Sequence, residues 1–153
     1  MGAVMGSGSN VRRKYFQSGF IQICALTAML QVAKNLGVEK GVAFVSVQEK
    51  RDDWGEVRFK AVNKTVVRPP RNDGSGDKGT SYFGVAMGKL AMMMATEQNS
   101  GPMGGSIPTG EMPYRGGLVR LEGRYRIFVG FSGGTEDQDV EIALIGMKML
   151  FPE

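Results

Sequence analysis

Carboxylates and one lysine are the residues with which this sequence could carry out acid–base chemistry, because it contains no histidine. Glu111 lies in a stretch rich in glycine and proline, and Lys89 lies within an apolar helical pattern. Asp137 and Asp139 lie where the last helix is expected to begin. Burial would have to shift the pKa of any of these groups before it could act as a base near neutral pH.

Each of these residues also has a structural interpretation, which we favour. Lys89 can extend from an apolar surface to water, and Glu111 fits a solvated loop charge. The two aspartates suit the first turn of a helix, where negative charge stabilises the helix dipole. We therefore assign no catalytic residue and keep catalysis as an alternative.

The lack of histidine and the single cysteine exclude several kinds of site. Without histidine the chain cannot form a Ser-His-Asp triad or a histidine-ligated zinc site. Cys24 alone cannot form an internal disulfide or a four-thiolate zinc site. Because Cys24 falls in an apolar helical pattern, we expect a buried core thiol in a reducing compartment, and no metal site.

The stretch GFSGGTEDQD, residues 130–139, connects an apolar run to a helical pattern. Paired glycines at a helix N-terminus can cradle a phosphate, but the acidic residues that follow them here would repel one. Thr135 and Gln138 have the spacing of a capping box, which stabilises a helix by about 1 kcal/mol. We therefore predict a structural turn and helix cap formed by Gly133, Gly134, Thr135, Gln138 and Asp139.

Hydrophobic periodicity predicts a helix, a hairpin, a loop and a second helix in the first two thirds of the chain. The hairpin spans residues 41–48 and 56–62, and the loop spans residues 63–80. The expected buried face of the first helix, residues 16–36, consists of Phe20, Ile23, Cys24, Thr27, Leu30 and Gln31. That of the second helix, beginning at Thr80, consists of Tyr82, Val85, Ala86, Lys89, Leu90 and Met93.

A Gly/Pro-rich loop at residues 100–117, a second hairpin and a last helix complete the chain. We expect the last helix to bury Val140, Ala143, Leu144, Met147 and Phe151. This order of elements suits an antiparallel sheet covered by helices. The AMMMA stretch, residues 91–95, is best explained by core or subunit packing.

The chain length predicts one domain over residues 16–153, preceded by a Gly/Ser-rich basic tail over residues 1–15. The net charge of +4 arises before Glu39, mainly in the RRK of the tail, which disfavours a nucleic-acid surface. No apolar run approaches the roughly 18 residues of a membrane span, so we expect a soluble intracellular protein without a transmembrane segment. The cytoplasm is the default compartment, and the acid-free beginning leaves an organelle matrix as an alternative.

The segment from residue 116 to 150 resembles the end of GlcG/HbpS-like proteins, a family that includes the C-terminal domain of PduO. The matching residues are Gly116, Gly117, Gly123, Gly130, Ser132, Gly133, Gly134, Gln138 and Asp139. The resemblance implies a profilin-like α/β (α+β) fold, with an antiparallel sheet of about five strands flanked by helices. It also implies assembly into oligomers and an association with haem, corrinoid or glycolate-related metabolism.

Haem is the cofactor that the resemblance suggests, but its identity stays open because the family's iron ligand is a histidine and this chain has none. Methionine, cysteine, tyrosine or lysine could replace it in principle. With the family as guide, the expected ligand-binding residues are Tyr82, Lys89, Met93, Gly104, Gly105, Glu111, Gly116 and Gly117.

The sequence thus favours a non-catalytic, oligomeric domain that binds a tetrapyrrole-like ligand or a small organic acid in a Gly-rich, apolar pocket. One alternative is a structural or accessory subunit of a larger assembly that has no ligand site. A second is a small enzyme with a carboxylate or lysine base.

Overall fold

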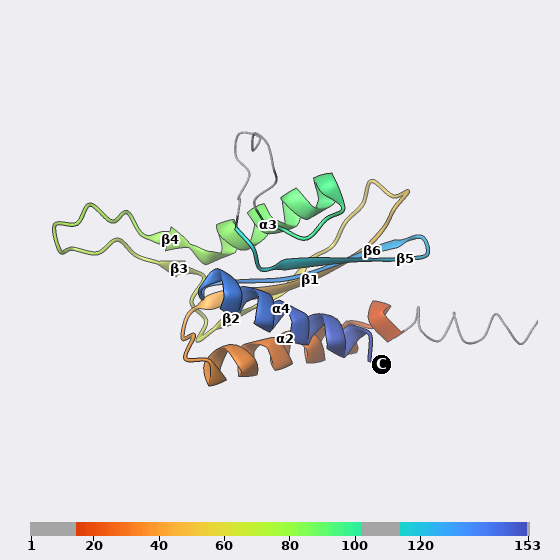
Figure 1. The fold of residues 1–153 in the computed structure, drawn as a ribbon, viewed down its shortest axis with the longest axis horizontal. Helices are drawn as coiled ribbons and strands as arrows, with labels where there is room; N and C mark the ends of the chain where they lie inside the picture. Colours follow the sequence, from red (N-terminus) through yellow and green to blue (C-terminus); the bar gives the residue numbers. More distant parts are fainter. Residues whose placement is uncertain (1–14, 102–113, 153) are drawn as a thin grey trace, which may run out of the picture.

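A computed structural model describes residues 15–101 and 114–152 of the chain (Figure 1). Its elements in order are α2 (Gly19–Asn35), β1 (Gly41–Glu49), β2 (Arg58–Val62), β3 (Val67–Arg68), β4 (Thr80–Ser81), α3 (Tyr82–Thr96), β5 (Gly117–Glu122), β6 (Tyr125–Ser132) and α4 (Glu136–Leu150). Among the described residues, no helix is both long and apolar enough to cross a bilayer.

The main sheet has four strands in the order β2-β1-β6-β5, and every neighbouring pair is antiparallel. Two local hairpins supply β1–β2 and β5–β6, as the alternating sequence pattern predicts. The central β1–β6 pair joins them over a long sequence separation and places Phe44 opposite Gly130. A Cβ at Gly130 would fall 2.4 Å from the Phe44 ring, so β6 needs a glycine there.

The expected antiparallel sheet of about five strands has four strands among the described residues, and two further strands form a separate ribbon. Strands β3 and β4 pair at the base of the 63–80 segment, which extends away from the sheet (Figure 1). Pro69 and Pro70 follow β3 directly and lack the N–H donors that a longer ladder would need. The Arg68 guanidinium closes the ribbon by pairing with the Asp77 carboxylate at 2.5 Å and 3.1 Å.

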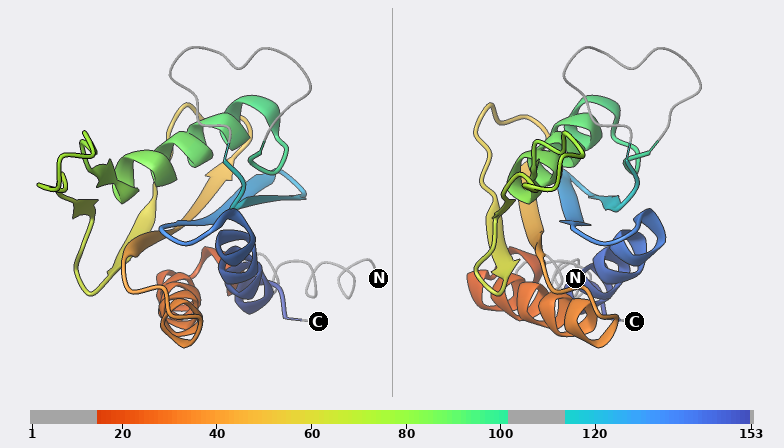
Figure 2. Two further views of the ribbon diagram at one scale, coloured as in Figure 1. Left: turned by 60° about the vertical axis from the view of Figure 1, so that its left-hand side comes forward. Right: turned by 90° about the vertical axis from the view of Figure 1, so that its left-hand side faces the viewer.

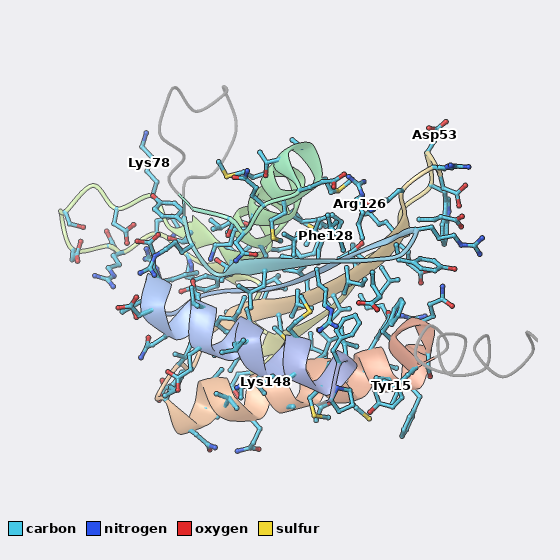
Figure 3. All side chains as sticks on the ribbon, turned by 45° about the vertical axis from the view of Figure 1, so that its right-hand side comes forward. Tyr15, Asp53, Lys78, Arg126, Phe128 and Lys148 are labelled. Atoms are coloured by element: carbon cyan, nitrogen blue, oxygen red, sulfur yellow. The ribbon has the colours of Figure 1, made fainter. Side chains whose placement is uncertain are left out.

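The sheet lies between two helical layers, with α2 and α4 on one face and α3 on the other (Figures 1 and 2). Strand β1 is buried on both faces because Ala43 and Val45 belong to the core under α2 and α4, while Val42 and Phe44 belong to the core under α3. Figure 3 shows Phe128 on the α3 side, in the same core as Phe44.

The predicted buried face of the first helix is wrong. Phe20 and Ile23 are 74% and 44% exposed, and Cys24 is only half-buried rather than a core thiol. The residues that face the core are Gln22, Ala25, Leu26, Met29 and Ala33. Apolar residues occur all around this helix, so periodicity alone does not select the face; the close approach of α4 does, because the Met29 sulfur lies against Gly146.

The other two helices follow their predicted patterns more closely. Helix α3 begins at Tyr82 instead of Thr80, because Thr80 and Ser81 pair with β3 and the Ser81 hydroxyl accepts a hydrogen bond from the Gly84 N–H. Helix α4 buries Ala143, but Leu144 is 42% exposed, which contradicts its predicted burial.

Candidate functional site

A buried ion pair connects α3, β6 and α4 beside the turn at residues 133–134. The Lys89 Nζ lies 2.9 Å from the Asp139 Oδ2, and it also donates to the Phe131 carbonyl at 2.8 Å. The two side chains are 1% and 5% exposed, so water screens their attraction little. Lys89 therefore does not extend to solvent, and Asp139 is more than a partner for the helix dipole.

Burial shifts the pKa of both partners. It lowers the pKa of the Lys89 ammonium and raises the pKa of the Asp139 carboxyl, because both charged forms lose hydration. The charge of each partner opposes the pKa shift of the other. The Gly134 N–H also donates a hydrogen bond to the Asp139 Oδ1 at 2.9 Å. The fold therefore depends on keeping the two groups together.

Gly116 packs tightly against the Lys89–Asp139 pair, and Gly117 packs tightly against Met93. A Cβ on Gly116 would fall 2.6 Å from the Asp139 Cβ and 2.7 Å from the Lys89 Nζ, and the φ of Gly116 is +122°. A Cβ on Gly117 would fall 2.8 Å from the Met93 sulfur. Four of the expected ligand-binding residues thus come together, but they pack against one another instead of lining open space. They are Lys89, Met93, Gly116 and Gly117.

An open hollow of about 360 Å³ lies on the other side of the 133–134 turn. Its lining consists of Gly37, Val38, Glu39, Lys40, Tyr82, Gly133, Gly134, Thr135 and Gln138. Tyr82 is therefore separated from Lys89, Met93, Gly116 and Gly117. It lies instead beside residues of the predicted turn and helix cap, which line the same hollow. The Gly134 N–H, bonded to Asp139, connects the wall of the hollow to the buried ion pair.

The helix cap shapes one wall of this hollow. The Thr135 N–H donates to the Gln138 Oε1 at 2.9 Å, and the Gln138 N–H donates to the Thr135 hydroxyl at 3.2 Å, which forms a capping box. Gln138 Nε2 also donates to the Leu36 carbonyl at 3.5 Å and so reaches the opposite wall. A Cβ on Gly133 would fall 2.3 Å from the Lys40 carbonyl, so this position excludes any side chain.

Two of the three acidic residues in the first turn of α4 have a basic partner. The Arg115 N–H donates to Glu136 at 2.8 Å, and the Arg115 guanidinium lies 2.5 Å from the Asp137 carboxylate. Asp139 is paired with Lys89. The repulsion that the sequence led us to expect for an anion near this turn is therefore weaker than the composition suggests.

Sequence reasoning missed Arg115 and Lys40. Lys40 reaches the turn through the register of β1 and β6, in which Val42 lies opposite Ser132, and no local signal predicts that pairing. Gly104, Gly105 and Glu111, also expected to bind ligand, lie outside the described residues. Within the described ranges, no group of three or more Cys, Asp or Glu side chains could hold a metal ion.

Comparison with known proteins identifies the fold. No protein-family model matches the chain, and no curated protein sequence does so. The PduOC:Heme complex matches 86% of this chain and 94% of its own, at 17% identity and a TM-score of 0.53. The Ybr137w protein matches 90% of this chain and 78% of its own, at 12% identity and a TM-score of 0.58. The chain therefore has the mixed α+β fold that its resemblance to GlcG/HbpS-like proteins implies.

Proposed function

We propose that this protein is a non-catalytic, self-associating domain over residues 16–153 that binds a small organic acid in the hollow beside Tyr82. The observation that carries the proposal is the hollow itself, whose walls are the 133–138 turn, the segment after α2 and the start of α3. Three separate parts of the chain converge there, and one wall is fixed by a helix cap.

The size of the hollow and the helix end beside it favour a small acid. Its volume of about 360 Å³ lies near the lower end of the range typical for small-molecule sites, roughly 300–1,000 Å³. The N-terminus of α4 carries a partial positive charge, and the lining contains one base, Lys40, and one acid, Glu39. Asp137 and Asp139 are paired with Arg115 and Lys89, which reduces the repulsion of a ligand carboxylate at this end of the helix.

The burial of the candidate base argues against catalysis. Lys89 is 1% exposed and holds Asp139, and Gly116 packs directly against both side chains. A substrate could reach the Lys89 amine only if this part of the core opened. Both groups therefore serve the fold, and the enzyme alternative has no accessible base at this place.

Haem is the ligand in the PduOC structure, which makes a tetrapyrrole the second candidate. In this chain Met93 is fully buried against Gly117, so its sulfur is not open to an iron. Tyr82 lines the hollow and is the described residue whose oxygen could serve as an axial ligand there.

A titration series separates these possibilities. Isothermal titration of the purified protein with glycolate, lactate and succinate should show saturable binding of at least one acid, with one site per chain. Tyr82→Phe should weaken that binding about fivefold through the loss of one hydrogen bond. The control Tyr15→Phe, at the opposite end of the molecule (Figure 3), should leave it unchanged.

Hemin titration completes the test. Saturable binding with a Soret shift that Tyr82→Phe abolishes would replace the acid by a tetrapyrrole. If neither the acids nor hemin bind, the protein has no such site and the accessory-subunit alternative takes over.

Exposed apolar side chains on the α2–α4 layer support self-association. Phe20, Ile23 and Leu144 are 74%, 44% and 42% exposed on this layer, and exposed apolar side chains mark a protein contact where they form one continuous patch. Light scattering should give a dimer or larger species, and Phe20→Glu should shift it toward monomer. Leu121→Glu, on an exposed apolar residue of β5, is the matched control and should not. A monomeric wild type would refute this part of the proposal.

A further inference from the structure

We propose that a second pocket binds a primary alkylammonium group. The pocket has a volume of about 220 Å³ and is formed by the β1–β2 connection, the end of β1, the start of β6 and the start of α2. It lies away from the hollow beside Tyr82 and shares none of its lining residues.

The charge of the pocket selects a cation. Glu49, Asp52 and Glu56 line it against the single positive charge of Arg58. Glu56 lies 3.4 Å from Arg58, and Glu49 lies 3.4 Å from Arg124. Asp52 forms no ion pair within 4 Å in the described ranges, although its charge acts on Arg124 and contributes to the raised pKa of that guanidinium. Three carboxylates thus face two cations, Arg58 and Arg124, and one negative charge is left in excess to attract a ligand.

Gln22 provides a neutral acceptor from the buried side. Its side chain is 7% exposed, and its Nε2 donates to the carbonyls of Phe16 at 3.1 Å and Gln17 at 3.5 Å. Two carbonyl partners fix the amide nitrogen toward them and leave the Oε1 pointing elsewhere. This oxygen accepts no hydrogen bond from the described residues, and it is not among their fully enclosed, unpaired polar atoms. It therefore keeps access to the pocket that Gln22 lines.

Aromatic side chains complete the chemistry. Trp54, 68% exposed, lines the pocket, and an ammonium group gains from the face of such a ring. Tyr125 also lines the pocket, but the Arg124 guanidinium already lies 5.4 Å from the centre of its ring. A primary ammonium has three N–H donors, which a carboxylate and the Gln22 carbonyl can accept. The volume lies below that of a typical drug-sized site and suits the end of one alkyl chain.

Such a group can come from a free amine or from the lysine side chain of another protein. Trp54 is the only tryptophan of the chain, so its fluorescence reports directly on the pocket. The probes are 1,5-diaminopentane for the free amine and Nα-acetyl-lysine N-methylamide for the lysine side chain, with pentane-1,5-diol as the uncharged control. We expect saturable quenching or shift with one or both amines and none with the diol. The amine that binds with the higher affinity shows whether the natural ligand is a free amine or a lysine side chain.

Asp52→Asn should weaken amine binding about tenfold, because it removes the negative charge that the pocket has in excess. The adjacent Asp53→Asn changes the net charge equally but lies at the tip of the connection, away from the pocket lining (Figure 3), and should leave the affinity unchanged. The proposal is overturned if neither amine saturates at 10 mM or below, if the diol binds as well, or if both aspartate variants weaken binding equally. Melting curves of both variants show that each is folded. This test does not depend on the outcome at the hollow beside Tyr82.

Discussion

Replacing Lys89 by methionine should destabilise the fold strongly, because it leaves the Asp139 carboxylate buried without a counter-charge. Methionine preserves the apolar length of the side chain, so the main change is electrostatic. The lost contacts are the 2.9 Å ion pair and the 2.8 Å hydrogen bond to the Phe131 carbonyl. Breaking a buried pair by removing one partner typically costs about 3–5 kcal/mol, a large part of the 5–15 kcal/mol that stabilises an ordinary domain.

The double variant Lys89→Met/Asp139→Asn distinguishes an unpaired charge from a simple packing defect. Asparagine at 139 keeps an acceptor for the Gly134 N–H but carries no charge. We therefore expect the double variant to be more stable than Lys89→Met alone, which corresponds to a large coupling energy. Urea denaturation followed by Trp54 fluorescence and by far-ultraviolet circular dichroism gives the free energies of unfolding.

The Arg115–Asp137 pair provides a matched control on the surface. Its atoms are 2.5 Å apart, but the side chains are 46% and 86% exposed, so solvent screens the interaction. Arg115→Met should change stability far less than Lys89→Met. If the two substitutions have equal effects, or if the effects of the two substitutions in the double variant simply add, the assigned role of the buried pair is wrong.

Three further predictions concern the turns and the ribbon. Gly116→Ala should destabilise the protein by several kcal/mol in urea denaturation, because its Cβ would meet the ion pair and its φ is +122°; Gly74→Ala, at φ +76° with nothing within 4 Å, should cost only about 1 kcal/mol. Thr135→Ala should lower stability by about 1 kcal/mol through loss of the cap, and an unchanged melting temperature would contradict this. The Arg68 guanidinium holds the pKa of Asp77 at about 2, below its ordinary 3.8. The pair therefore contributes stability above about pH 4 and loses it as the pH falls from 3.8 toward 2. Proteolysis of the ribbon should accelerate in this window for wild type, and an equal pH response in Asp77→Asn would contradict the assignment.

The local elements could be predicted because their signals are short-range. The alternating patterns of both hairpins are contained within a few residues of each turn. The spacing of Thr135 and Gln138 likewise reports a cap that the structure contains. Such features depend on neighbouring residues and need no knowledge of the rest of the chain.

The site could be predicted only in part because it depends on long-range packing. Lys89 and Asp139 are 50 residues apart, and they meet because α3 and α4 start near the same end of the sheet on opposite faces. Each residue had a satisfactory local explanation, so no local pattern indicated that the two side chains pair. The buried face of α2 failed similarly, since the choice among its apolar sides is made by α4 and the sheet.

The most direct test of the proposed function is a ¹H–¹⁵N correlation spectrum of the protein titrated with the organic acid that binds best. Backbone amides of Gly133, Gly134 and Gln138 should shift together and saturate, while those near Asp52 should stay in place. Absence of saturable shifts at the turn, or saturable shifts confined to other surfaces, would contradict a ligand site beside Tyr82.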